Sequence, residues 1–264
     1  MNQQLIHFDS AFAQLDNLND PFSCTFSLAN PLRNVNQITL KSIEIPVAFN
    51  NIRNSGTLNQ FGITIGGTVY SITLSTNNYA SISTLCTDIT TAFTGLTLPN
   101  NAILTMSAGT TNVIVSLVST VQTNFVVNQT QLSFYILGFK NQSAQINTTS
   151  GSNRTSTINA LNSFNLNIDN YANFSIINLP VLNNANCNGI ISSFKIPLNC
   201  LTGEVLYLEE NQTFKQSVLI TNNGIVINSL KVVITDRFGN SLSNNGIDYS
   251  FSLGFVFKHA DEEI

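Results

Sequence analysis

Residues 249–257 read Tyr-Ser-Phe-Ser-Leu-Gly-Phe-Val-Phe, with an apolar side chain at every second position from Phe251 onward. Residues 37–45 read Gln-Ile-Thr-Leu-Lys-Ser-Ile-Glu-Ile and begin with the same alternation, in which Ile38 and Leu40 are the apolar members. Successive side chains of a β-strand point to opposite faces, so a period of two predicts strands with one buried face. Both stretches indicate a β-fold.

Short runs rich in Ile, Val, Phe and Thr recur along the chain and are separated by polar residues. Runs of this length and composition between turn residues are typical of strands. The further expected strands span residues 22–28, 61–65, 69–74, 103–106, 113–118, 164–168, 174–178, 193–198, 205–208, 216–221 and 230–235.

Two segments depart from this pattern. Residues 81–93 carry apolar side chains three or four positions apart, which predicts an amphipathic helix with Ser81 as its N-cap. A shorter helical turn is expected over residues 131–137, ended by Gly138, because glycine readily takes the left-handed conformation that closes a helix. Gly66-Gly67 predicts a two-residue hairpin turn.

The expected architecture is all-β, an antiparallel β-sandwich of jelly-roll type with one or two short helices. Strands do not alternate with helices, and no fixed-length repeat argues for a propeller or solenoid. We expect a single jelly-roll domain over residues 1–264, with a polar loop or insertion around 141–192. Residues 141–160 are the most polar part of that region and are expected to form an exposed loop or a seam between two halves of the sandwich.

Charged residues make up 9% of the chain, and its formal net charge is -4. An ordinary soluble domain has about 25% charged residues. Asn, Thr, Ser and Gln replace the missing charge, which predicts a surface suited to packing against identical copies. An AT-rich genome would also favour Asn, but it would favour Lys equally, and Lys and Arg together number only 10.

The sequence argues against several partners and locations. Basic residues are scattered from Arg33 to Lys258 without forming a stripe, so no direct nucleic-acid binding is expected. No apolar run approaches the length of a membrane span, and the first residues lack the pattern of a signal peptide. We therefore expect synthesis and folding in the cytoplasm. The four cysteines are far apart and predict buried thiols, with no zinc site or disulfide framework: Cys24, Cys86, Cys187 and Cys200.

The search for reaction chemistry predicts no catalytic, cofactor-binding or metal-binding residues, and therefore a protein that is not an enzyme. His7 and His259 lack acidic or cysteine partners at ligand spacing. The neighbouring carboxylates Glu209 and Glu210 point apart along the chain and are expected in a solvated loop, and residues 261–263 form an acidic tail.

Two other carboxylates are candidates for a catalytic side chain. Asp236 belongs to the sequence Thr-Asp-Arg-Phe-Gly-Asn over residues 235–240, where its side chain is expected to hydrogen-bond the backbone of a turn. Asp248 follows an Asn-Gly turn and is given the same structural interpretation. The chain has no Trp to stack on a sugar, although its Tyr and Phe residues leave a lectin-like site open.

Residues 230–257, with Val-Val-Ile-Thr-Asp-Arg-Phe-Gly-Asn at 232–240 and Asn-Gly at 245–246, resemble the closing strands of a known family. That family is the single-jelly-roll minor capsid (penton) proteins of large DNA viruses, virophages and polinton-like viruses. Residues 78–93 are similar to its Tyr-bearing turn before a short helix, and Leu132 to Phe139 to its Leu-Gly-Phe element.

The resemblance implies an assembly role in the capsid of a virion. It implies a homopentamer at the vertex whose copies make head-to-tail contacts and touch major capsid proteins and other capsid subunits. Two alternatives stay open. One is a receptor- or glycan-binding jelly-roll module, such as a fibre head or lectin, and the other is a hydrolase of unfamiliar type.

Overall fold

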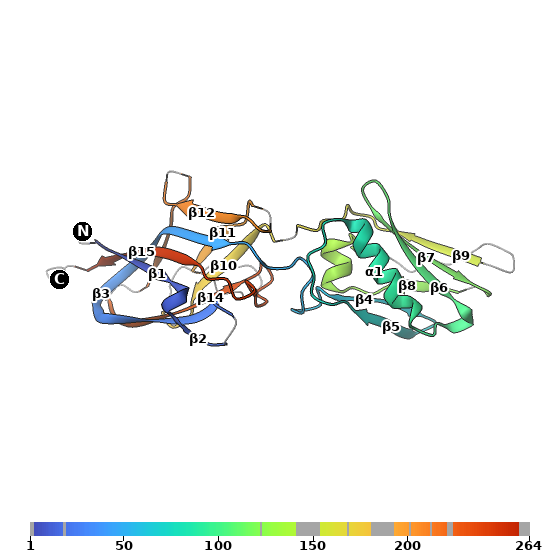
Figure 1. Ribbon diagram of the computed structural model, residues 1–264, viewed down its shortest axis with the longest axis horizontal. Helices are drawn as coiled ribbons and strands as arrows, with labels where there is room; N and C mark the ends of the chain where they lie inside the picture. Colours follow the sequence, from blue (N-terminus) through green and yellow to red (C-terminus); the bar gives the residue numbers. More distant parts are fainter. Residues whose placement is uncertain are drawn as a thin grey trace. The chain divides into compact units, whose positions relative to one another are not determined.

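The chain folds into two compact units, which are described separately below (Figure 1). Unit 1 comprises Met1–Phe49 and Asp169–Ile264, and unit 2 comprises Asn50–Ile168. The computed structural model describes residues 3–17, 20–121, 123–140, 154–167, 169–180, 193–200, 202–211, 213–220 and 224–258.

The division into units differs from the expected single domain over residues 1–264. The inserted segment is residues 50–168, whereas an insertion was expected around 141–192. The reason lies in the core of unit 1, whose buried side chains all come from residues 8–49 and 172–255. The two ends of the chain therefore bury their apolar faces against each other, and the core residues of unit 1 within the described ranges belong to these two ends.

Unit 1 is an antiparallel β-sandwich of jelly-roll type built around one long strand, β3 (Ser23–Pro46). Its strands form a single nine-stranded sheet in the order β1-β15-β3-β14-β10-β11, while β2, β12 and β13 also pair with β3. The other strands are β1 (Gln3–Asp9), β2 (Gln14–Leu15), β10 (Tyr171–Ile176), β11 (Phe194–Pro197), β12 (Val205–Glu209), β13 (Gln216–Leu219), β14 (Ile225–Thr235) and β15 (Ser250–Phe257).

A bend in β3 folds this sheet into two layers. The first half of β3, up to Val35, pairs with β14. Residues from Val35 onward pair with β15 on one side, and residues from Gln37 onward pair with β13 and then β12 on the other. Asn34 has a left-handed backbone, and Gly224 lies against it so closely that a Cβ would stand 2.9 Å from the Asn34 Cα. We call β1, β15, β12, β13 and the second half of β3 the first layer, and β2, β14, β10, β11 and the first half of β3 the second layer.

Aromatic side chains fill the space between the layers. Phe251 of β15 stacks on Phe8 at 4.9 Å between ring centroids and meets Phe26 and Phe174 edge-on at 5.3 and 4.9 Å. Offset and edge-to-face arrangements at these separations are the favourable geometries for aromatic pairs. The alternation expected in residues 249–257 thus places one apolar row of β15 in the core.

Amide side chains complete the backbone hydrogen bonding at several strand ends. The Gln216 side chain accepts from the Lys195 N–H at 2.7 Å and donates to the Lys195 carbonyl. The Asn178 side chain accepts from the Lys231 N–H at 2.9 Å and donates to the Ser229 carbonyl at 3.0 Å. Backbone groups near a strand edge need partners, so part of the Asn and Gln content serves the fold itself.

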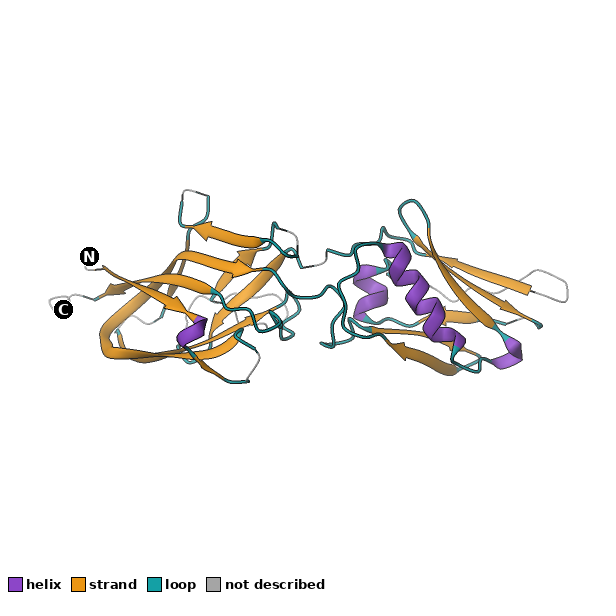
Figure 2. Cartoon of the chain, in the orientation of Figure 1, coloured by secondary structure: helices purple, strands orange, loops and turns teal. Residues whose placement is uncertain are grey.

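Unit 2 contains two three-stranded antiparallel sheets and the helix α1 (Ile82–Thr94), which packs against β5 and β6. Strands dominate both units, and α1 is the longest helix among the described residues (Figure 2). The sheets have the orders β5-β4-β8 and β6-β7-β9. Their strands are β4 (Gln60–Ile65), β5 (Thr68–Thr73), β6 (Ile103–Ala108), β7 (Val113–Ser119), β8 (Phe125–Val127) and β9 (Arg154–Asn159).

Several expected local features of unit 2 are confirmed. The Ser81 side chain accepts from the Thr84 N–H at 3.2 Å and caps α1. The apolar face of the helix is buried, and Phe93 meets Phe61 of β4 edge-on at 5.8 Å. Gly66 and Gly67 form the β4–β5 turn with positive φ angles. The predicted short turn is a π-helical segment over Leu132–Ile136, and Gly138 beyond it has φ of 83°.

Other boundaries were wrong. The runs at 22–28 and 37–45 belong to one strand, and the strand expected at 174–178 spans Tyr171–Ile176. Residues 164–167 are not in a strand, whereas Arg154–Asn159, expected in a polar loop, form β9. A polar sequence forms a strand here because β7 supplies its hydrogen-bond partners, which sequence periodicity does not reveal. The rest of the expected polar segment, 141–153 and 181–192, lies outside the described residues.

Candidate assembly surface

The outer face of the first layer carries the polar side chains that sequence analysis considered for chemistry. His7, Ser252, Ser42 and Glu209 occupy one register position across β1, β15, β3 and β12. The Ser252 hydroxyl lies 2.6 Å from His7 Nδ1 and accepts from the Ser42 hydroxyl at 2.8 Å. These cross-strand bonds tie neighbouring strands together on the outer face.

Carboxylates make this outer face acidic. Asp9, Glu44 and Glu209 point outward from β1, β3 and β12, and Glu210 follows directly after β12. A bulge in the β3–β15 pairing places Lys41 among them, where its ammonium pairs with the Glu210 carboxylate. The Glu209 carboxylate raises the pKa of the neighbouring Tyr207 phenol, as a negative potential at this face requires.

Apolar side chains lie between these charges. Leu5, Val205 and Tyr207 are 53%, 54% and 59% exposed, and the strand registers place all three on the same outer face. A hollow of about 360 Å³ is lined by Leu5 and Gln3 of β1 and by Lys41, Glu209 and Glu210. The face therefore combines exposed apolar side chains with a net negative charge, a composition that suits contact with a cationic side chain on an apolar stem.

The outer face of the second layer has a cationic feature instead. Lys195 of β11 is exposed, and its ammonium lies 3.8 Å from the ring centroid of Tyr171 on β10. The Arg237 guanidinium approaches the same ring at 6.0 Å. Two cations near one aromatic ring form a positive group, which we call the Lys195 cluster (Lys195, Tyr171 and Arg237).

The structure gives the two single aspartates different structural roles. Asp236 Oδ1 accepts from the N–H groups of Phe238 and Asn240, both at 2.8 Å, and closes the turn after β14 as expected. Asp248 accepts from the Ser10 hydroxyl at 2.8 Å, and that hydroxyl also accepts from the Tyr249 N–H. Asp236 thus closes a local turn, whereas Asp248 ties the start of β15 to Ser10 after β1, 238 residues earlier in the chain.

The remaining sequence candidates are not brought into one site. His259, Cys187 and residues 261–263 lie outside the described residues. Burial raises the pKa of the Cys24 and Cys86 thiols to about 11, as expected for buried, inert cysteines. Over the described ranges, His, Cys, Asp and Glu side chains do not gather in threes as a metal site would need. Neither α1 nor any helical turn in the same ranges has the length and hydropathy of a membrane-crossing helix.

The Lys195 cluster was missed by the sequence analysis. Its members are 24 to 66 residues apart in the chain, and only the pairing of β10 with β11 and β14 brings them together. A single lysine at the second position of a short strand gives no signal of its own.

Comparison with known proteins finds similarity in structure but not to a protein family. No protein-family model matches the chain, and no curated protein matches it. The chain is similar in structure to the selenomethionine-labelled mavirus penton protein. The two share 10% sequence identity, with a TM-score of 0.42, over 97% of this chain and 99% of that one.

Proposed function

We propose that the chain is a structural, non-enzymatic viral capsid protein, a penton (vertex) or minor capsid protein that closes into rings of five and contacts major capsid proteins in the virion. The observation that carries the proposal is the opposite charge on the two outer faces of unit 1. The first layer presents the acidic face, and the second layer presents the Lys195 cluster. A head-to-tail contact between identical copies needs two different, complementary patches, and such contacts close into rings.

The hollow on the acidic face supports this arrangement. Lys195 of one copy would enter the hollow of the next, with its methylene chain against Leu5 and its ammonium near Glu209. Exposed Val205 and Tyr207 would add apolar area around this contact. Tyr is among the residues enriched at interface centres, and a specific contact needs about 1,000 Å² or more of buried surface.

Protection of a sheet edge supports face-to-face packing over strand addition. The Gln216 amide occupies the Lys195 N–H and carbonyl on β11, so a foreign strand would have to displace it. Blocked edges prevent uncontrolled strand pairing between copies of a β-protein. Assembly would then proceed through the charged faces, where geometry can limit the number of copies.

Charge reversal tests the proposal. Native mass spectrometry and light scattering of the full chain should show a closed oligomer of five. Glu209→Lys and Lys195→Glu should each weaken the contact about tenfold or more, because each places like charges together. The double variant should recover assembly, since the charges are complementary again.

A matched control comes from unit 2. Lys140 also lies over aromatic rings, 4.9 Å from the Phe134 centroid, yet it belongs to neither charged face of unit 1. Lys140→Glu should leave the oligomer unchanged. A chain that stays monomeric at all concentrations and is missing from purified particles would end the proposal, and a double variant no better than the single ones would end the contact described here.

A further inference from the structure

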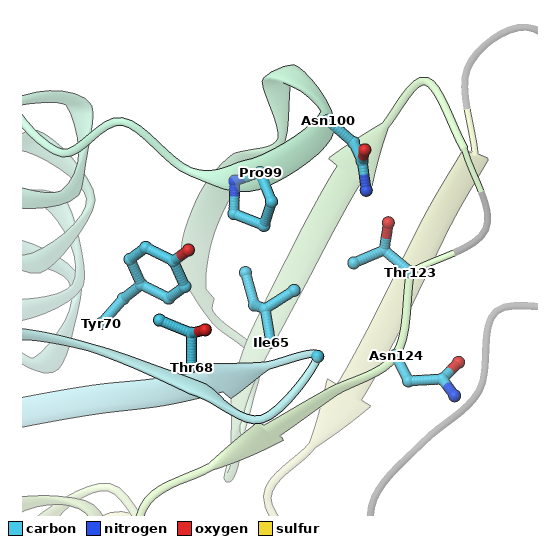
Figure 3. Close-up of a pocket in the computed structure, with 8 residues that line it drawn as sticks. Ile65, Thr68, Tyr70, Pro99, Asn100, Thr123 and Asn124 are labelled. Carbon is cyan, nitrogen blue, oxygen red and sulfur yellow. The ribbon is translucent and has the colours of Figure 1, made fainter.

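Unit 2 contains a pocket of about 480 Å³ at one end of its strands, shown in Figure 3. The hairpin between β4 and β5 forms one wall, and the turn at Pro99–Asn101 and residues 123–124 before β8 form the others. All of its lining residues are uncharged. Burial of a charged ligand without a counter-charge would be costly, so the pocket favours a neutral ligand.

One part of the pocket is apolar and includes an aromatic ring. Tyr70 is half-buried, and Figure 3 shows its ring beside Pro99 and Ile65. The face of an aromatic ring, next to aliphatic carbons, packs well against the C–H groups of a pyranose. The chain has no Trp, and Tyr70 is the aromatic residue among those that line this pocket.

The other part offers unused hydrogen-bonding groups. Within the described residues, the Asn100 and Asn124 amides and the Thr68 and Tyr70 hydroxyls have no hydrogen-bond partner, and both amides are exposed. An amide presents a donor and an acceptor side by side, which matches a sugar hydroxyl that both donates and accepts. Some other Asn side chains of unit 2 are engaged with the backbone, such as Asn51 with both the N–H and the carbonyl of Tyr79.

The loop that carries Asn100 is fixed in place. Asn100 has a left-handed backbone with φ of 57°, and its carbonyl accepts from the Thr120 N–H at 3.3 Å and the Thr120 hydroxyl at 3.0 Å. Asn tolerates this conformation better than most residues, so the loop can hold it without unusual strain. Gly66 leaves space at the opposite wall, because a Cβ there would meet no atom within 4 Å.

We infer that this pocket binds a neutral sugar, with the pyranose ring on Tyr70 and its hydroxyls on the Asn100 and Asn124 amides. A volume of this size accommodates one or two sugar rings. The pocket belongs to unit 2, and the assembly surface belongs to unit 1. The inference can therefore be tested independently of the capsid proposal.

A glycan array probed with the full chain should show binding to oligosaccharides with neutral terminal sugars. The strongest neutral oligosaccharide then serves as the probe for titration by nuclear magnetic resonance. Asn100→Gly should weaken its binding about three- to tenfold, as expected for one neutral hydrogen bond, while glycine keeps the left-handed backbone. Tyr70→Ala should weaken binding more than tenfold, and Tyr70→Phe should retain most of it.

Asn101→Gly is the matched control. Asn101 has the same left-handed conformation, with φ of 50°, but does not line the pocket, so its variant should bind like the parent chain. Thermal unfolding of each variant shows whether the fold is intact. The inference is overturned if the array shows no binding or if only sialylated or sulfated glycans bind. It is also overturned if folded Asn100→Gly and Tyr70→Ala variants both bind like the parent chain.

Discussion

The two units divide the charges of this chain very unevenly. Of its 10 basic and 14 acidic residues, unit 2 holds only Arg53, Asp88, Lys140 and Arg154, and all others belong to unit 1. The low overall charge is therefore an average of two different surfaces. Unit 1 places charge of opposite sign on its two faces, which suits steering and register between copies. Unit 2 relies on amides and hydroxyls, which suit recognition of a neutral ligand.

The cores differ as well. Unit 1 joins its layers through a network of aromatic rings in which Phe251 contacts Phe8, Phe26, Phe174 and Tyr249. In unit 2 a single aromatic pair, Phe61 with Phe93, links a strand to α1. Each unit thus has interior contacts of its own. We therefore expect a substitution in the core of one unit to lower the stability of that unit and not of the other.

The largest expected effect is that of Phe251→Ala, which removes a fully buried ring and leaves a cavity costing about 3–5 kcal/mol of unfolding free energy. The loss should be confined to unit 1. Amide hydrogen exchange should show faster exchange in β3, β14 and β15, with α1 still protected.

Phe61→Ala is the reciprocal variant. It should make the backbone amides of β4 and α1 exchange faster, while the amides of unit 1 stay protected. Equal loss of protection in both units, from either variant, would show that the chain unfolds as one cooperative body and would break the comparison.

A smaller effect is expected from alanine at two left-handed glycines, one in each unit. Gly66→Ala should cost about 1–2 kcal/mol, the strain of a left-handed alanine in open space. Gly224→Ala should cost about 3 kcal/mol, because the added Cβ also collides with the backbone of Asn34 at the bend of β3. Denaturant unfolding of both variants measures the difference, and equal costs would mean that the bend tolerates a side chain.

The smallest effect concerns the charges of unit 1. The Ser23 hydroxyl, and after it Lys231 at 3.2 Å, hold the pKa of Asp16 below its usual 3.8. A lowered pKa gives stability that is present above pH 3.8 and is lost as pH falls through the folded-state value. Asp16→Asn should therefore cost at most about 1 kcal/mol at pH 7, since the ion pair is largely exposed, and nothing at strongly acidic pH.

Asp20 is the contrasting case. Burial raises its pKa, so its charge weakens the fold at neutral pH, and stability is regained as pH falls through the raised value. Asp20→Asn keeps an acceptor for the Phe22 N–H and should slightly stabilise unit 1 at pH 7. Unfolding curves from pH 2 to 7 that show the same sign for both variants would contradict these assignments.

Sequence periodicity found the elements with strong local signals. The Ser81 cap, the apolar face of α1 and the Gly66-Gly67 hairpin are set by residues within a few positions of one another. Strands β1 and β9 were missed, because much of β1 is exposed and β9 is polar and depends on β7. The sugar pocket was not visible in the sequence either, since Tyr70, Asn100 and Asn124 belong to three separate segments.

By itself, the sequence determined that this protein is an antiparallel β-fold with a short capped helix, because period and capping act over a few residues. Only the tertiary structure decided that residues 50–168 form a unit of their own and that β3 serves two layers. It also decided that Lys195 and Glu209 mark opposite faces of one sandwich. These features depend on pairings between residues far apart in the chain, and such pairings are selected by burial and register in the folded molecule.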